Sequence, residues 1–174
     1  RPHSSQTLDV VNPATDKVCL QMACANEADV NAAVAAARAA FPAWSKTPAN
    51  VRADFLMAIA DEMDARTDEL IEAHVMCMGI PRHQALDFQI AAPIEAVRYF
   101  AGLCGSVDEV AEVENVITLR EPIGVCVLIN PWNYPLMQMV GKFAPAFAAG
   151  CTVVAKPAEQ TPLPDVIMAE IFHK

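Results

Sequence analysis

The stretch GVCVLINPWNYP, residues 124–135, decides the fold, because an apolar strand runs directly into an unusual polar segment. Residues 124–129 are continuously apolar and do not alternate with polar residues, which is typical of a strand buried on both faces. Residues 135–149 have helical periodicity, and residues 152–155 form a second apolar run of strand length. Two buried strands joined by a helix predict a parallel pair with a right-handed crossover.

The polar segments that follow the two predicted strands are the strongest indication of a site. They are residues 130–134, NPWNY, and residues 156–160, KPAEQ. In open α/β sheets, ligands bind beyond the carboxyl ends of the strands. We therefore expect these segments to lie side by side on one rim. The sequence has no G-x-G-x-x-G pattern after the first strand, so spacing alone does not identify a dinucleotide site.

The chain before residue 105 is predicted to be mainly helical, so the fold class is α/β. We expect Phe55 to belong to the buried stripe of the second helix, and residues 105–114 to form an acidic loop. The predicted elements are strands at residues 8–11 and 18–22, helices that begin after the caps Asn26 and Thr47 and near residue 67, a helix at residues 82–103 that Pro93 kinks or divides, and an exposed antiparallel strand at residues 115–120.

Composition excludes several classes of function. The chain has 174 residues, with 12 basic and 21 acidic side chains, for a formal net charge of −9. An acidic chain without a basic run is a poor nucleic-acid binder, and no apolar stretch is long enough to span a membrane. We see no secretion signal, and the start at Arg1 suggests a trimmed N-terminus. The six cysteines are expected to be reduced and mostly buried, which points to the cytoplasm.

Each candidate side chain on the predicted rim has a functional and a structural interpretation. The amide of Asn133 is suited to donate a hydrogen bond to a developing oxyanion, or it bonds its own backbone in a turn. Trp132 either lines a ligand site or belongs to the core. Lys156 and Glu159 suit a ligand rich in hydroxyl groups, or they form a solvated surface ion pair. The four histidines do not have metal-ligand spacing, so no metal site is predicted.

Four motifs resemble the aldehyde dehydrogenase superfamily. They are EPIGVCVLINPWNYP at residues 121–135, FAPAFAAGCTVVAKPAEQTPL at 143–163, NPATD at 12–16 and AAVAAARAAFPAW at 32–44. The resemblance covers almost the whole chain, and P-W-N together with K-P-A-E is highly specific. It implies a Rossmann-like sheet that also lacks the usual glycine pattern.

The resemblance implies a role for each rim residue. Asn133 would be catalytic and donate its amide to the oxyanion of a thiohemiacetal. Tyr134 stands where phenylalanine is usual and would face the substrate tunnel. An acidic Glu159 favours NAD, with NADP possible. The cofactor-binding residues implied by the resemblance are Ile129, Pro131, Trp132, Lys156, Pro157, Ala158 and Glu159.

The resemblance also implies that the chain is part of a larger enzyme. Residues 1–104 and 121–174 would be the N-terminal part of the cofactor-binding domain, and residues 105–120 one strand of a bridging element that assembles a homodimer or homotetramer. The catalytic domain and its nucleophilic cysteine would lie outside this chain. We expect NAD(P)-dependent oxidation of an aldehyde to a carboxylic acid by the complete enzyme, and none by this chain alone. The alternatives are a non-catalytic binding or assembly fragment and an enzyme that transfers the acyl group to coenzyme A.

Overall fold

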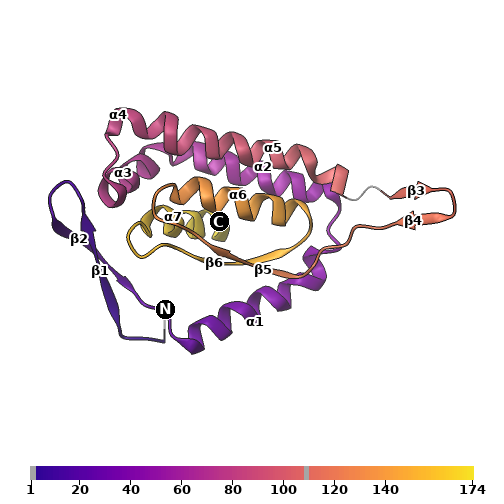
Figure 1. Cartoon of the computed structure of the whole chain (residues 1–174), viewed down its shortest axis with the longest axis horizontal. Helices are drawn as coiled ribbons and strands as arrows, with labels where there is room; N and C mark the ends of the chain where they lie inside the picture. The colour runs from indigo at the N-terminus through magenta and orange to yellow at the C-terminus, as the bar shows by residue number, and fades with distance from the viewer. Residues whose placement is uncertain (1–2, 108–109) are drawn as a thin grey trace.

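A computed structural model describes residues 3–107 and 110–174. Helices form a layer above a short two-stranded sheet, one long helix lies below it, and two hairpins extend from the body (Figure 1). The strands are β1 (Thr7–Asn12), β2 (Lys17–Ala23), β3 (Ala111–Val113), β4 (Val116–Thr118), β5 (Val125–Ile129) and β6 (Thr152–Lys156). The helices are α1 (Glu27–Trp44), α2 (Ala49–Ala65), α3 (Thr67–Met78), α4 (Arg82–Ala85), α5 (Ala92–Val107), α6 (Pro135–Ala148) and α7 (Leu163–His173).

The predicted strand–helix–strand unit is confirmed. Strands β5 and β6 pair in parallel, with Val125 opposite Thr152 and Ile129 opposite Lys156, and α6 connects them. Gly150 follows the end of α6, and its positive φ of 77° suits a residue at that place. Its inner face carries the centre of the core, where Phe143 is fully buried. The crossover brings the carboxyl ends of both strands to the same edge.

The prediction that both strands are buried on two faces is wrong, because Thr152 is the only buried residue of β6 and Leu128 the only one of β5. Leu128 is buried, whereas Val127 and Ile129 are 62% and 64% exposed. The described sheet has only these two strands, with α6 on one side and α1 on the other (Figure 1). A parallel sheet of two strands offers too little area for helices to cover every apolar side chain.

Helix α1 begins as its sequence predicts. Asn26 accepts a hydrogen bond from the backbone N–H of Asp29 at 3.1 Å, and Asp29 accepts one from the N–H of Asn26 at 3.0 Å, which completes a capping box. Farther along the helix, the carbonyl of Ala37 accepts a bond from the hydroxyl of Thr152 at 2.9 Å. This bond attaches α1 to the start of β6.

Two expectations for α2 are wrong. Pro48 is the cap residue and Ala49 the first helical residue, while the hydroxyl of Thr47 bonds back to the carbonyl of Ala43 instead of capping α2. Phe55 is 55% exposed and packs edge-to-face on Trp44, with 5.5 Å between ring centroids. It borders a groove between helices rather than the core.

The expected interruption at Pro93 is confirmed. A π-helical turn at Leu86–Ala91 separates α4 from α5. Pro93 follows this segment almost directly, and its missing N–H and the clash of its ring with the preceding turn account for the interruption of the α-helical pattern there. The helix then continues to Val107, past the expected end at residue 103, so the first residues of the expected loop at 105–114 are helical.

The segment expected to be one bridging strand is a hairpin. Strands β3 and β4 pair antiparallel, with Val113 opposite Val116. The hairpin projects away from the body (Figure 1). Residues 108 and 109 of the expected 105–120 segment lie outside the described residues. The sequence did not indicate β3 within the acidic run before residue 115, because the three residues Ala111–Val113 are too few to show strand periodicity.

Replacing Gly79 by alanine is expected to lower the free energy of unfolding by about 2 kcal/mol. Gly79 ends α3 with a φ of 76°, and a Cβ atom there would lie 2.6 Å from Cγ of Pro13 in the first hairpin. Backbone strain at the positive φ and the clash with Pro13 therefore both destabilise the variant. Urea denaturation checks this, with Gly102→Ala as the control, because a Cβ at Gly102 meets nothing within 4 Å. Equal stability of Gly79→Ala and the parent would contradict it.

Candidate functional site

The two polar segments lie side by side beyond the carboxyl ends of β5 and β6, as predicted. The backbone N–H of Asn130 donates to the carbonyl of Lys156 at 3.1 Å, which extends the pairing of the strands by one residue. The hydroxyl of Thr161 donates to the carbonyl of Trp132 at 3.0 Å. These two bonds hold residues 130–134 against residues 156–161 and create one continuous rim.

Asn133 and Tyr134 lie in the turn between β5 and α6. Both are exposed. Pro131 restricts the start of the turn, and Pro135 is the first residue of α6, where a missing N–H has no cost. The turn therefore has few accessible backbone conformations and presents the Asn133 amide to solvent. This placement is compatible with an amide that donates to a bound group.

Trp132 is a surface residue, so its interpretation as core is wrong. Its side chain is 59% exposed. It lines a shallow pocket together with Glu159 and with Leu8 and Val11 of the first hairpin. Neighbouring Ile129 is 64% exposed and Pro131 is also exposed. Large apolar side chains exposed beside a polar rim are typical of a ligand wall.

Lys156 and Glu159 form an ion pair in the described chain. The ammonium of Lys156 lies 3.1 Å from a carboxylate oxygen of Glu159 and donates to the carbonyl of Pro157 at 2.7 Å. The two side chains are 51% and 60% exposed. The N–H of Glu159 itself, and then Lys156, lower the pKa of the Glu159 carboxyl, so it is ionised at neutral pH. Ala158 is buried between them and holds the segment against the protein.

Behind the rim lies a buried polar cluster that sequence reasoning missed. The side-chain amide of Asn130 donates to a carboxylate oxygen of Asp165 at 2.8 Å, and its oxygen accepts from the ammonium of Lys142 at 3.3 Å. Asn130 and Asp165 are 4% and 3% exposed. The sequence offered one signal for this cluster, which was Asn130, a polar residue directly after the apolar run of β5.

The Asp165 carboxyl has a strongly altered acidity. Burial raises its pKa to about 6, although Asn130, Lys142 and Lys156 oppose the change. The ordinary carboxyl pKa is 3.8, so the folded protein holds a proton on this group between pH 4 and 6 that the unfolded chain has released. The resulting stability is present below pH 4 and is lost as the pH rises through about 6.

Another buried charge, Arg52 on α2, also escaped prediction. Its guanidinium donates to the carbonyls of Ala148 at 3.0 Å, Thr47 at 2.6 Å and Cys104 at 3.5 Å. Arg52 is 3% exposed. It joins the ends of α6 and α5 and the start of α2, and lies away from the rim.

The cysteines have the environments of structural thiols. All six are free. Burial raises the pKa of Cys77 to about 11, and burial together with the neighbouring Cys151 thiol raises the pKa of Cys126. A raised pKa disfavours the reactive thiolate. Cys151 directly precedes β6 and is buried, whereas Cys126, on β5, is only half-buried. No catalytic cysteine is assigned among the six.

His74 is a core residue. It is fully buried, and its Nδ1 lies 2.7 Å from the carbonyl of Leu70. Burial lowers its pKa, so the ring is neutral at physiological pH. Across residues 3–107 and 110–174, no three His, Cys, Asp or Glu side chains are grouped to hold a metal ion. In the same ranges, no helix has the length and apolar character needed to cross a bilayer.

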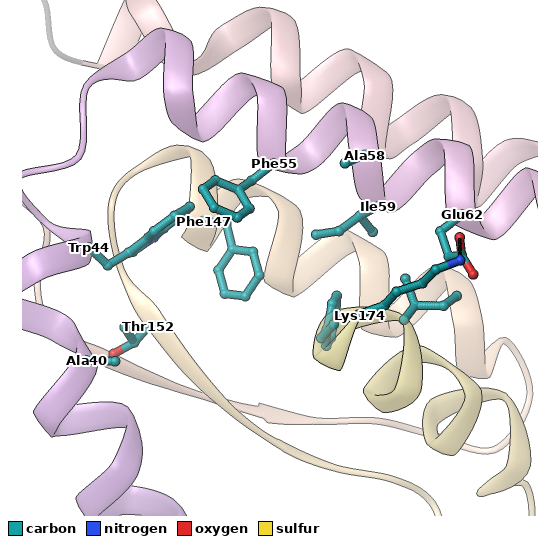
Figure 2. A pocket seen from close by; sticks show the side chains of 11 residues that line it. Ala40, Trp44, Phe55, Ala58, Ile59, Glu62, Phe147, Thr152 and Lys174 are labelled. Atoms are coloured by element: carbon teal, nitrogen blue, oxygen red, sulfur yellow. Dashed lines mark hydrogen bonds and ion pairs between the residues drawn. The ribbon is translucent and has the colours of Figure 1, made fainter.

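An apolar groove lies apart from the rim. It is bordered by Trp44 and Phe55, which approach Phe147 from α6, and by an ion pair of 2.8 Å between Lys174 and Glu62 (Figure 2). Glu62, Lys174 and Thr152 are the polar side chains of the lining, and it includes none of the predicted rim residues. The site residues that the sequence predicts lie on the rim, apart from this groove.

The chain matches known proteins along its full length. Residues 1–174 match a family model described as the aldehyde dehydrogenase family. A mitochondrial aldehyde dehydrogenase of Leishmania tarentolae is 40% identical over 172 residues, which are 97% of this chain and 34% of that protein. A 3-succinoylsemialdehyde-pyridine dehydrogenase of Pseudomonas sp is 38% identical over 100% of this chain and 37% of its own length.

Solved structures show the same similarity. A variant of aldehyde dehydrogenase C from Pseudomonas syringae, in complex with NAD+ and octanal, superposes with a TM-score of 0.96 at 43% identity. The match covers 99% of this chain and 36% of that one. The chain thus spans about a third of the length of the relatives it matches.

Proposed function

This chain belongs to the aldehyde dehydrogenase family, and from that premise we propose that it is the N-terminal part of an enzyme that oxidises an aldehyde to a carboxylic acid with NAD. The observation that carries the proposal is the rim, where the bonds from Asn130 to Lys156 and from Thr161 to Trp132 place an exposed amide beside an exposed Lys–Glu pair.

The rim residues fit a dinucleotide. The half-exposed ammonium of Lys156 can donate to a ribose hydroxyl, and the ionised carboxylate of Glu159 can accept from one. The exposed side chains of Ile129 and Trp132 supply apolar area against which the rings of the cofactor pack. Pro131, Pro157 and Ala158 shape the backbone between these contacts. When bound, NAD accepts a hydride.

In the proposed mechanism, Asn133 stabilises negative charge. Its side-chain N–H donates to the oxygen of the aldehyde as a thiolate from elsewhere in the complete protein attacks the carbonyl carbon. The amide carries no charge and does not titrate, so its contribution is the same across the neutral pH range. Tyr134, the next residue, faces the substrate. Trp132 lies on the cofactor side of the same turn.

The chain organisation follows the same proposal. Residues 1–104 and 121–174 contribute to cofactor binding, and the hairpin within residues 105–120 bridges subunits of a homodimer or homotetramer. The nucleophile lies in the part of the enzyme that this chain does not contain. We therefore expect the protein confined to residues 1–174 to be inactive.

The proposal is tested with a panel of aldehydes and NAD. Denaturing mass spectrometry of the natural protein first establishes whether the polypeptide is longer than this chain. Formation of reduced cofactor is then measured for the natural polypeptide and for residues 1–174. We expect oxidation by a longer polypeptide only. Turnover by residues 1–174 alone would overturn the assignment of the nucleophile to another part of the protein.

Glu159→Gln in the complete enzyme is expected to shift cofactor preference about tenfold toward NADP, because the variant removes a charge that repels a 2′-phosphate. The ratio of kcat/KM values for NAD and NADP measures the shift. Glu95→Gln, at an exposed glutamate on α5, is the matched control. An unchanged ratio in Glu159→Gln would show that this carboxylate does not face the ribose.

A further inference from the structure

Asn130 is the point at which three elements meet behind the rim. Its backbone N–H bonds the last residue of β6, and its side chain bonds Asp165 in the first turn of α7. Its amide nitrogen also lies 3.4 Å from the sulfur of Met139, and its oxygen accepts from Lys142, both on α6. The residue therefore has its position fixed from β6, α6 and α7 together.

The position of Asn130 determines where the catalytic turn begins. The next residue is Pro131, whose ring fixes its own φ and restricts the backbone of the residue before it. A fixed Asn130 side chain thus sets the direction in which residues 131–134 leave the strand. Two residues farther on, the bond from Thr161 holds the carbonyl of Trp132. Asn133 lies directly after this second attachment.

The ionised carboxylate of Asp165 lowers the stability of the fold, because it is buried with few hydrogen bonds. It is 3% exposed, its Oδ2 bonds the neutral amide of Asn130, and its Oδ1 has no hydrogen-bond partner among the described residues. An asparagine or an apolar residue of similar size would avoid the burial of a charge. A carboxylate that destabilises the fold at neutral pH requires a reason beyond packing.

We propose that Asp165 is a positioning residue for the turn of residues 131–134, which it holds through Asn130 so that the Asn133 amide points toward the substrate. The catalytic consequence rests on the proposed function, whereas the control of the turn does not. The ionised carboxylate accepts the Asn130 amide strongly and is attracted by Lys142 on α6 and Lys156 at the end of β6.

Protonation of Asp165 is expected to loosen the turn. A neutral carboxyl loses its attraction to the two lysines and is a weaker acceptor for Asn130. The charged side chains that α2 and α3 bring toward α7 have other partners, since Glu62 pairs with Lys174 and Arg66 with Glu170. The loosening of the turn should therefore follow the protonation of Asp165, with a midpoint near pH 6.

The turn carries its own reporter, Trp132. In a Trp44→Phe background, Trp132 is the single tryptophan of the chain. We expect its fluorescence and its quenching by acrylamide to change with a midpoint near pH 6. Asp165→Asn, which keeps the shape and removes the titration, should abolish this transition. His83→Gln, a change at an exposed position on α4, should leave the transition unchanged and serves as the control for a surface substitution.

A second variant and a kinetic readout complete the test. Asn130→Ala removes the bond between Asn130 and Asp165, so the fluorescence of Trp132 should no longer change with pH. In the complete enzyme, Asp165→Asn should lower kcat about tenfold with little change in the KM for NAD. An unaltered Trp132 transition in both Asp165→Asn and Asn130→Ala, or no transition in the parent, overturns the proposal. Loss of the transition in a protein that oxidises no aldehyde supports the control of the turn and contradicts the proposed function.

Discussion

Replacing Asn133 by alanine in the complete enzyme is expected to lower kcat by about 10²–10³-fold, the loss typical of one oxyanion donor. The side chain is exposed in a turn held between Pro131 and Pro135. Its removal leaves the core intact and takes away one N–H that acts only when negative charge develops on the substrate. Steady-state kinetics with a saturating cofactor measure the effect, and circular dichroism confirms that folding is unchanged.

Asn31→Ala is the matched control, because Asn31 is also exposed but lies on α1, in a different element from the rim. It should leave kcat within about twofold of the parent, as surface substitutions away from a site usually do. If Asn133→Ala instead raises KM and leaves kcat unchanged, the amide contributes to ground-state binding and not to the oxyanion.

Arg52→Met is expected to lower the free energy of unfolding by about 3–5 kcal/mol, because it leaves buried carbonyls without their charged donor. The guanidinium bonds Ala148 at the end of α6, Thr47 before α2 and Cys104 on α5. Methionine fills much of the volume but donates nothing. Urea denaturation followed by circular dichroism gives the change in unfolding free energy.

Two further variants sharpen this prediction. Arg38→Met, at an exposed arginine on α1, should change the unfolding free energy by less than about 0.5 kcal/mol. Arg52→Lys should restore only part of the loss, since an ammonium cannot reproduce the planar set of five N–H donors. Stability of Arg52→Met within about 1 kcal/mol of the parent would mean that water replaces the guanidinium at these carbonyls.

The strand–helix–strand unit and its rim could be predicted because their signals are local. The apolar runs at residues 124–129 and 152–155 fix the strands, and the proline-rich segments that follow them must meet at one edge. The cap at Asn26 and the left-handed Gly79 are likewise set within a few residues. Each of these features depends on neighbours in the sequence, which is where pattern analysis is strongest.

The buried polar contacts could not be predicted because they depend on distant partners. Asn130 and Asp165 are 35 residues apart, and Arg52 and Ala148 are 96 residues apart. In the sequence, Asp165 looks like an ordinary acidic residue near a helix start, and Arg52 like one on an exposed helix face. The exposure of Val127 also depends on the number of strands in the sheet, which the local pattern does not contain.

The bond between Thr152 and Ala37 has a consequence for the order of folding. It joins residues that are 115 positions apart, so the chain must close a long loop before the bond can form. The turns of α2 and α5 need only near neighbours and can form much earlier. We therefore expect the attachment of α1 beneath β6 to be among the last steps of refolding. Protection of the α1 amides from hydrogen exchange would then mark the moment at which the native topology is complete.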